Sequence, residues 1–487
     1  MDGWVGAWTG GHRAVHVGNV ADFNEQFLLE PSTRRRFTLG RLPAGGSVTG
    51  PSVTGPSVTG PSTADPAAAP SPAGPSAERR ADRLRRAHHY AGLAVGYSPE
   101  PAALVLPAEV DRAWIDWLAR ELDWGPVELF DGIAPGRTVA EALAARPALA
   151  ERLATGPGPL LFWGRTPDQG EGPELAAVRR YEAKDAAHGL LTALAQDHPG
   201  VRVPRQEPAD GPRAAARRLA AHAARGRTTV VKSRYGVGGY GTVVITPAEL
   251  SAAGGARALL RRLVREDALP PGGPLLLEEY VDGGPAGTGR LRDLTFDAVI
   301  GADGRVHPVG VGEMAVDGTR YQGVTVGPGV VPPGAAATAE RFGLAVGERL
   351  AEAGHRGWYD VDFVTDRERR LAPTETNLRL TGPAIAFVLR HRLDEVRGPG
   401  HLVRTLDAMP LGARLSQEAL HGHLDRLRPA CARLGATLLP LIVTAGHEPD
   451  PAVGLALAAR SVEALDAAQA LLGAAHHALG RMFEALR

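Results

Sequence analysis

Two residue types are nearly missing from this 487-residue chain, which has one cysteine, Cys431, and two lysines, Lys184 and Lys232. A single cysteine excludes an intramolecular disulfide framework and a cysteine cluster that binds zinc. The other 52 basic residues are arginine, a bias that we interpret as drift of surface lysines to arginine. A compact ammonium group fits where the wide, planar guanidinium does not. Both lysines are therefore candidates for sites that require lysine, with survival by chance as the alternative.

The chain also lacks an excess of charge and a long apolar segment. Lys+Arg and Asp+Glu each number 54, so no basic surplus would attract nucleic acid or an acidic membrane surface. No run approaches the roughly 18 apolar residues of a membrane span, and the N-terminal MDGWVGAWTGGHR lacks the apolar core of a signal peptide. We expect a cytoplasmic protein with small-molecule partners, no nucleic acid and no membrane, and the sequence leaves a homodimer open.

A segment rich in proline, glycine and serine interrupts the first part of the chain. The pentapeptide SVTGP occurs three times between residues 47 and 61 and runs into STADPAAAPSPAGPS. Such a composition cannot fill a core or fix regular structure. Residues 43–77 are therefore predicted to be a disordered insertion that acts as a spacer within the first domain.

Outside this insertion, the patterns of apolar residues predict an α/β chain with several antiparallel hairpins. The predicted helices cover residues 81–89, 109–124, 181–196, 217–225, 335–353 and 462–486. The predicted strands are HRAVHV, PLLFWG, TTVVKS, GTVVIT, LLLEEYV, LTFDAVI, VHPVGVGEM, WYDVDFVT, RLAPTETNLR and LLPLIVTA.

The glycine-rich segment VVKSRYGVGGYGT contains the pattern G-x-G-x-x-G at Gly236, Gly238 and Gly241. A dinucleotide fingerprint would lead into a helix, but this loop leads into the β-branched strand GTVVIT. A P-loop would end in Gly-Lys-Ser/Thr, and a kinase would place its lysine after the glycines. Here Lys232 precedes them. A strand, a lysine, a glycine loop and a second strand suit a hairpin that folds over a triphosphate.

Two later strands carry oxygen ligands. WYDVDFVT contains Asp360 and Asp362, and RLAPTETNLR contains Glu375, Asn377 and Arg379. Because side chains alternate along a strand, the last three point to one face, and Asp362 on the neighbouring antiparallel strand can meet them. Two carboxylates and an amide oxygen suit Mg²⁺, and an arginine adds positive charge beside a transferring phosphoryl group. A polar strand edge that faces water is the alternative.

Together these features resemble the ATP-grasp carboxylate–amine ligases, the superfamily of D-alanine–D-alanine ligase, glutathione synthetase and biotin carboxylase. The likeness covers about Tyr181 to Arg379. YEAKDAAHGLL is similar to the first ATP-lysine motif, VVKSRYGVGGYG to the second lysine with its loop, and LLLEEYV to the adenine hinge. Both lysines of the chain thus fall where this family has its two nucleotide lysines.

Softer motifs are similar to actinobacterial natural-product peptide ligases of the pheganomycin type: VGNVADFNE, VRVPRQE, GEMAVDGTRYQGVTVGPG, TETNLRLTG and ALAARSVEALDAA. This resemblance implies an α/β ATP-grasp fold with a pre-ATP-grasp α/β domain over residues 1–155, an ATP-grasp domain over 156–405 and a small C-terminal α/β domain over 406–487. The SVTGP insertion departs from the family pattern. Peptide-bond formation in natural-product biosynthesis is implied, and neither substrate is fixed.

The resemblance also implies a chemistry, in which a carboxylate attacks the γ-phosphoryl group of ATP and an amine captures the resulting acyl phosphate. Mg²⁺ would be held by Asp362, Glu375 and Asn377. Arg379 would stabilise the acyl phosphate and the tetrahedral adduct, and Lys232 and Arg292 are the further catalytic candidates. The implied ATP-binding residues are Lys184, Lys232, Ser233, Gly236, Gly238, Gly239, Gly241, Glu278, Glu279, Tyr280 and Val281, with the backbone of Glu279 and Val281 at the purine edge.

Weaker candidates and two rival functions remain open. Arg292, with Arg290, could grip a phosphate or a substrate carboxylate, Tyr321 and its neighbouring glycines could line the amine site, and Asp360 could be a third metal ligand or support Asp362. A carboxylase, or a ligase with a thiol or hydroxyl acceptor, would share the fold. A non-catalytic ATP-binding module would release no ADP in response to a carboxylate.

Overall fold

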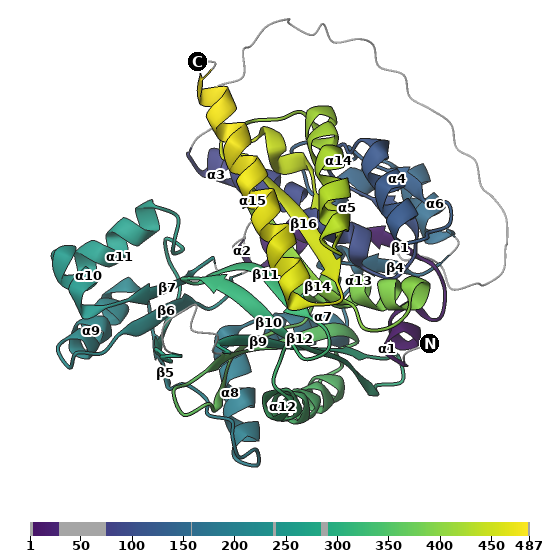
Figure 1. The fold of residues 1–487 in the computed structure, drawn as a ribbon. Coiled ribbons are helices and arrows are strands. Elements are labelled where there is room, and N and C mark those ends of the chain that lie inside the picture. Colours follow the sequence, from purple (N-terminus) through teal and green to yellow (C-terminus); the bar gives the residue numbers. More distant parts are fainter. Residues whose placement is uncertain (1–2, 29–74, 157, 237–239, 284–290, 486–487) are drawn as a thin grey trace, which may run out of the picture.

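The computed structural model describes residues 3–28, 75–156, 158–236, 240–283 and 291–485 (Figure 1). Most of the predicted spacer, residues 43–74, lies outside these ranges, as do Gly238, Gly239 and Arg290. The last three residues assigned to the spacer, 75–77, instead begin a helix, α3 (Pro75–Tyr90).

The N-terminal part of the chain forms a four-stranded parallel sheet in the order β3-β2-β1-β4. Its strands are β1 (Ala14–Val17), β2 (Pro101–Val105), β3 (Glu128–Phe130) and β4 (Leu160–Phe162). The helices of this part are α1 (Gly3–Thr9), α2 (Val20–Leu28), α3, η2 (Ala91–Gly96), α4 (Arg112–Glu121), α5 (Val139–Ala144) and α6 (Pro147–Ala154). Sequence-distant segments therefore meet: β1 lies between β2 and β4 and joins the two sides of the insertion.

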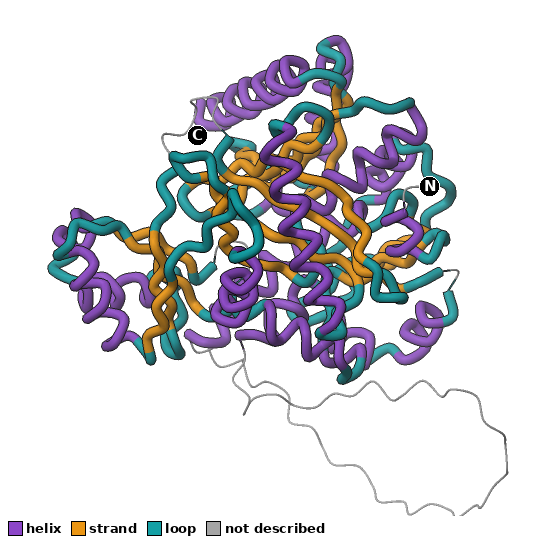
Figure 2. Tube along the Cα trace, turned by 90° about the horizontal axis from the view of Figure 1, so that it is seen from below, coloured by secondary structure: helices purple, strands orange, loops and turns teal. Residues whose placement is uncertain are grey.

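A small antiparallel sheet in the order β5-β8-β6-β7 carries the lysine–glycine hairpin. Its strands are β5 (Gln206–Ala209), β6 (Thr229–Ser233), β7 (Thr242–Ile245) and β8 (Leu275–Glu279). Three helices share an apolar core with it, α9 (Pro212–Ala223), α10 (Pro247–Ala252) and α11 (Ala256–Arg265). Figure 2 shows this unit as a lobe that projects from the rest of the molecule.

The centre of the molecule is an eight-stranded antiparallel sheet in the order β13-β12-β9-β10-β11-β14-β16-β15. Its strands are β9 (Asp293–Ile300), β10 (Val306–Asp317), β11 (Arg320–Val326), β12 (Gly357–Thr365), β13 (Leu371–Asn377), β14 (Leu402–Pro410), β15 (Thr437–Ile442) and β16 (Ala452–Ala459). The helices around it are α7 (Pro173–Tyr181), α8 (Lys184–Ala195), α12 (Pro333–Glu352), α13 (Gly382–Arg397), α14 (Gln417–Arg433) and α15 (Val462–Ala485), with short η3 (Pro167–Gln169) and η4 (Thr444–His447).

The predicted α/β fold is confirmed, because a parallel sheet is combined with two antiparallel α/β units in one chain. The division into three domains stays a prediction. Its last boundary, near residue 405, falls inside β14, and the central sheet continues across it into β15 and β16.

Helix α4 shows how the N-terminal part is fixed to the C-terminal part. Asp111 caps the helix by accepting a hydrogen bond from the amide of Ala113 at 2.9 Å. The apolar stripe of the helix then buries Trp114 and Trp117 in the core of the C-terminal strands. The Trp117 indole donates to the carbonyl of Leu438 in β15 at 3.1 Å. The apolar stripe of α4 is therefore buried in the C-terminal part of the chain.

The single helix predicted over residues 181–196 is wrong. These residues do not form one continuous helix, because α7 ends at Tyr181 and α8 begins at Lys184. The sequence analysis also did not predict α13, α14, β14 and β16, which lie in the last quarter of the chain. Along the described ranges, no helix is both long and apolar enough to cross a membrane.

Candidate active site

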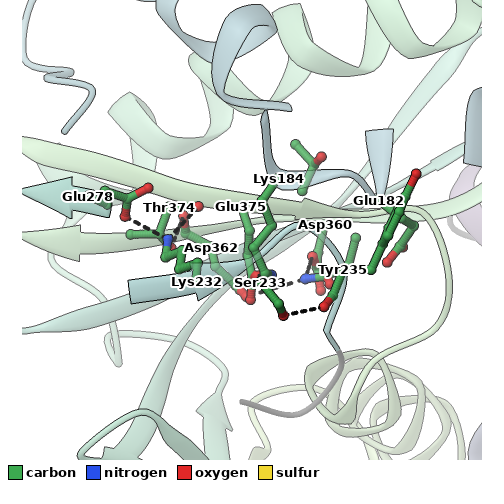
Figure 3. Close-up of polar contacts among 12 residues, drawn as sticks. Glu182, Lys184, Lys232, Ser233, Tyr235, Glu278, Asp360, Asp362, Thr374 and Glu375 are labelled. Carbon is green, nitrogen blue, oxygen red and sulfur yellow. Dashed lines mark hydrogen bonds and ion pairs between the residues drawn. The ribbon is translucent and has the colours of Figure 1, made fainter. Parts of the chain in front are cut away.

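The break between α7 and α8 holds Lys184 against β13. The Thr376 hydroxyl donates to the carbonyl of Tyr181 at 2.9 Å, and the amide of Leu378 donates to the carboxylate of Glu182 at 2.6 Å. These two bonds fix the linker on the strand, so that α8 starts at Lys184. The Lys184 ammonium group, which is buried, then forms an ion pair with Glu375 of the same strand (Figure 3).

Lys232 reaches β13 from the small sheet. It lies in the all-buried strand β6, between β7 and β8. Its Nζ is 2.6 Å from Oε1 of Glu278 and donates to the carbonyl of Thr374 at 3.1 Å. Gln206 donates to the other oxygen of Glu278 at 2.9 Å. Lys232 therefore contacts the residue next to the one that Lys184 contacts (Figure 3).

The loop after Lys232 turns back sharply at its described ends. The amide of Ser233 donates to the carbonyl of Gly241 at 2.6 Å, and the Ser233 hydroxyl donates to the carbonyl of Tyr235 at 2.5 Å. Gly241 has a φ of +74°, and a Cβ there would lie 1.9 Å from the Ser233 Oγ. A Cβ on Gly236 would lie 2.1 Å from the carbonyl oxygen of Tyr240. Both positions thus require glycine for close backbone approach.

The loop also contacts the N-terminal part. The ring of Tyr235 stacks on that of Phe27 in α2, with 4.9 Å between centroids and 21° between planes. The Tyr235 hydroxyl lies 3.4 Å from the carbonyl of Arg179 in α7. The entrance of the glycine loop is therefore held by two elements outside its own sheet.

The predicted metal ligands lie side by side on β12 and β13. Asp362 is opposite Glu375 and Asp360 is opposite Asn377 in the strand register. The Asn377 amide nitrogen donates to Asp360 at 2.7 Å and to Asp362 at 3.3 Å. Figure 3 shows Asp360, Asp362 and Glu375 grouped beside Lys184. The structure thus brings the three predicted ligands and both lysines to one part of the sheet.

Arg379 lies just beyond β13 and is enclosed by the N-terminal part. Its guanidinium donates to Oδ1 of Asn377 at 2.8 Å and to the carbonyl of Leu380 at 3.0 Å. It also lies over the rings of Phe23 and Trp163, at 5.7 and 5.6 Å from their centroids. Arg379 is therefore a buried cation fixed at the end of the carboxylate cluster.

The carboxyl groups of this cluster have different pKa values. Burial raises the pKa of Asp362 well above its ordinary value, and the charges of Asp360 and Glu375 raise it further. Burial also raises the pKa of Asp360, to about 7, against the opposing charge of Arg379. For Glu375, burial favours the neutral acid, but the ammonium groups of Lys184 and Lys232 outweigh it and lower the pKa. Glu375 is therefore the most readily ionised of the three.

The donor set fits Mg²⁺. Within the described ranges, Oδ1 of Asp362 and Oδ2 of Asp360 are buried without a hydrogen-bond donor, and carboxylate oxygens are the ligands that Mg²⁺ prefers. No three His, Cys, Asp or Glu side chains of the described residues are placed to hold a metal by themselves. The predicted set differs from such a cluster because it has two carboxylates and one amide. Mg²⁺ bound in this way takes its other ligands from water and phosphate oxygens.

Other predicted site residues are placed apart from this cluster. Arg292 pairs with its neighbour Asp293 at 3.4 Å, at the start of β9. At the predicted adenine hinge, Glu278 is an ion-pair partner of Lys232, and the amide of Glu279 is already bonded to the carbonyl of Arg205 at 2.8 Å. Tyr280 and Val281 follow the end of β8, and Val281 is buried. Gly238 and Gly239 lie outside the described residues.

Two acidic residues of the site were not predicted. Glu182 is buried, accepts from Leu378 and lies 3.9 Å from the Arg379 guanidinium. Asp297 lies opposite Asp360 in β9 and accepts from Trp358 at 2.9 Å and Thr295 at 2.8 Å. An aspartate in the middle of the apolar strand LTFDAVI is the sequence signal that points to Asp297. For Glu182 the sequence holds no signal beyond its place beside Lys184.

Solved structures similar to this chain include an N5-carboxyaminoimidazole ribonucleotide synthetase in complex with ADP, at 14% identity and a TM-score of 0.47 over 76% of this chain and 89% of that one. An L-amino acid ligase from Bacillus licheniformis matches at 14% identity and 0.44, over 71% and 86%. A biotin carboxylase from Campylobacter jejuni matches at 12% and 0.44, over 73% and 81%. Neither a protein-family model nor a curated protein matches the chain. Because the sequence identities and TM-scores are this low, the activity has to be inferred from the chain's own residues.

The glycine geometry gives a first prediction. Gly241→Ala should lower the free energy of unfolding by about 1–2 kcal/mol, because a non-glycine residue in the left-handed region is strained and the new Cβ would meet Ser233. Gly334→Ala is the matched control, since it lies in α12 with open space at its Cβ. Chemical denaturation measures both. Equal stability of the two variants would contradict the loop geometry.

Proposed function

We propose that this chain is an ATP-grasp ligase that forms ADP and joins a carboxylate to an amine through an acyl phosphate. The observation that carries the proposal is the convergence of both lysines on adjacent residues of β13, Thr374 and Glu375, beside Asp362. The lysines come from α8 and β6, which belong to different units of the fold. Two buried ammonium groups beside a carboxylate–amide set are suited to a metal-bound triphosphate.

In this proposal Lys184 and Lys232 bind the α- and β-phosphates of ATP. Both are paired with carboxylates, Glu375 and Glu278, and phosphate oxygens compete for the same ammonium groups because they carry more negative charge. The glycine loop, which follows Lys232, is the proposed binding element for the β- and γ-phosphates, through backbone amides as in other nests. The strand end after Glu278 receives the adenine.

Asp362, Glu375 and Asn377 are the proposed Mg²⁺ ligands. When bound, Mg²⁺ would neutralise charge that develops on the β- and γ-phosphates. Glu375 would have to exchange its ion pair with Lys184 for the metal, and its low pKa keeps it ionised for this role. The Asn377 amide is oriented by Asp360 and Arg379, which bind its nitrogen and its oxygen.

Arg379 is the proposed stabiliser of the acyl phosphate. A carboxylate cannot lose oxide, but after phosphorylation it can lose phosphate, and the extra negative charge needs a fixed cation. Arg379 meets this need because Phe23 and Trp163 shield it from water. Exclusion of water also protects the acyl phosphate from hydrolysis. Arg292 stays a catalytic candidate for gripping a phosphate or carboxylate. Peptide-bond formation in natural-product biosynthesis is the narrower form of the proposal.

The direct test is ADP release. The protein with Mg²⁺ and ATP is incubated with a panel of amino acids and short peptides, singly and in pairs, and ADP and the products are measured by a coupled assay and mass spectrometry. We expect ADP and a new amide when a suitable pair is present. ADP release without a carboxylate requirement, or a product with a thioester, ester or carboxylated base, would contradict the proposal.

The role of Lys232 gives a second prediction. Lys232→Arg keeps the charge but replaces a compact ammonium with a wider group in a strand whose residues are all buried. ADP release should fall by roughly 100-fold, the usual loss when one transition-state contact is removed. Arg218→Lys, the reverse change at a half-exposed pair with Glu207, should leave the rate unchanged. A wild-type rate in Lys232→Arg would rule out phosphate binding by this lysine.

The metal set gives a third prediction. Glu375→Ala should abolish stimulation of ADP release by Mg²⁺, because it removes the carboxylate with the lowered pKa. Glu368→Ala, in the exposed turn between the same two strands, is the control and should keep the wild-type Mg²⁺ dependence. Thermal melting shows whether each variant is folded. An unchanged Mg²⁺ titration in folded Glu375→Ala would exclude this residue as a ligand.

A further inference from the structure

A second polar site lies on β14, a strand that was not predicted from the sequence, and is separated from Arg379 by the rings of Tyr90 and Trp163. In β14, Leu406 pairs with Leu455 and Met409 pairs with Val453, so that two residues of β14 face one residue of β16. The extra residue makes a β-bulge at Asp407. Bulges redirect side chains and are frequent beside active sites. Here the bulge turns a carboxylate towards the N-terminal part of the chain.

Asp407 is about nine-tenths buried, but only one of its two carboxylate oxygens accepts a hydrogen bond from the part of the chain that the structure describes. Its side chain is 9% exposed, and its Oδ2 accepts a hydrogen bond from the Tyr90 hydroxyl at 2.7 Å. Among the described residues, none donates to Oδ1. A buried carboxylate oxygen without a donor is costly. Burial accordingly raises the pKa of Asp407 to about 7, and the bond from Tyr90 offsets only part of that rise.

Two tyrosines flank this carboxylate. Tyr90 ends α3, and Tyr321 lies in β11, where its hydroxyl is 3.3 Å from the Thr405 Oγ1. Both residues are partly exposed. Burial raises the pKa of Tyr321 well above its ordinary value, and the charge of Asp407 raises it further.

The same residues adjoin the proposed site of acyl-phosphate formation. The rings of Tyr90 and Trp163 form a T-shaped contact with 5.5 Å between centroids, and the Arg379 guanidinium also lies over the Trp163 ring. On the opposite side, Tyr321 packs against Gly382, three residues after Arg379. A Cβ on Gly382 would lie 2.5 Å from the Tyr321 ring. Asp407 is therefore connected to Arg379 through the rings of Tyr90 and Trp163.

We propose that Asp407, together with the hydroxyls of Tyr90 and Tyr321, binds the ammonium group of the amine substrate. The inference rests on the proposed ligase function and names the group that its second substrate must carry. An ammonium group has three donors, and Oδ1 of Asp407 is an acceptor with a negative charge. The aromatic rings around it also favour a cation over a neutral group. A hydroxyl or a thiol could donate one hydrogen bond to this oxygen but would leave its negative charge unpaired, and bicarbonate would add a second negative charge.

The same carboxylate can prepare the amine for attack. Ionised Asp407 accepts one proton from the bound ammonium, so that an N–H bond breaks, an O–H bond forms on Asp407, and nitrogen regains its lone pair. That pair forms the C–N bond to the acyl carbon while the C–O bond to phosphate breaks, and the leaving phosphate takes the second proton. A raised pKa suits this transfer because the buried carboxylate is a stronger base than an exposed one.

Binding tests the inference without relying on turnover. Calorimetry, with Mg²⁺ and a non-hydrolysable ATP analogue present, measures the affinity of a panel of L-amino acid amides and of the matching α-hydroxy amides, which lack the ammonium group. We expect at least one amino amide to bind more tightly than its hydroxy counterpart. Asp407→Asn should weaken its binding by roughly 10- to 100-fold, as for the loss of one bond to a charged group, and should remove the preference.

Two further variants serve as controls for the effect of Asp407→Asn on amide binding. Tyr90→Phe, which keeps the ring but removes one donor, should weaken amide binding by less than Asp407→Asn does. Asp450→Asn, an exposed aspartate in the same part of the chain, should bind the amides as the wild type does. If no amide binds the wild type better than its hydroxy analogue, or if folded Asp407→Asn keeps the preference, the inference is wrong.

Trapping with hydroxylamine separates this inference from the proposed function. Hydroxylamine is small, largely uncharged at neutral pH and captures acyl phosphates as hydroxamates. Asp407→Asn should still form hydroxamate from carboxylate and ATP, because hydroxylamine does not need the ammonium site, and the control Asp450→Asn should form it at the wild-type rate. Wild-type protein that forms no hydroxamate with any carboxylate would overturn the ligase proposal, while the amide preference would still decide the role of Asp407.

Discussion

The structure depends on the attachment of two lysines to one strand. Lys184 and Lys232 contact adjacent residues of β13, although one begins a helix and the other lies in a separate sheet. Burial of an ammonium group is costly unless it is paired, so each contact fixes the position of the element that carries it. Lys184 holds the start of α8, and Lys232 holds the small lobe against the central sheet. The carboxylates that pair with them, Glu375 and Glu278, lie where we propose that a triphosphate and its metal bind.

The N-terminal part completes this arrangement. Phe23 and Trp163 enclose Arg379, and Phe27 stacks on Tyr235 at the entrance of the glycine loop. The C-terminal strands contribute a further contact with the N-terminal part, because Asp407, at the bulge in β14, accepts a hydrogen bond from Tyr90. A site built from every part of the chain can close around two substrates only if these parts keep their places. The burial of Trp114 and Trp117 among C-terminal residues provides that fixed contact.

Sequence patterns predicted strand pairing correctly where local rules decide the outcome. Alternation along strands brought Asp362 to the strand that carries Glu375 and Asn377, and the order of strand, lysine and glycines correctly gave the β6–β7 hairpin. Prediction from the sequence failed where tertiary contacts override the local preference of a segment for helix or strand. The helix predicted over residues 181–196 is broken because Tyr181 and Glu182 bond to β13. Strand β16, AVGLALAA, has no alternation because it is buried on both faces, so its pairing with β14, and hence the bulge at Asp407, could not be foreseen.

The most direct test is a crystal structure with Mg²⁺ and a non-hydrolysable ATP analogue. The account predicts that both lysine ammonium groups leave Glu375 and Glu278 and lie within hydrogen-bond distance of phosphate oxygens, with a metal ion on Asp362 and Glu375. Nucleotide bound elsewhere, with both lysines still on their carboxylate partners, would contradict it.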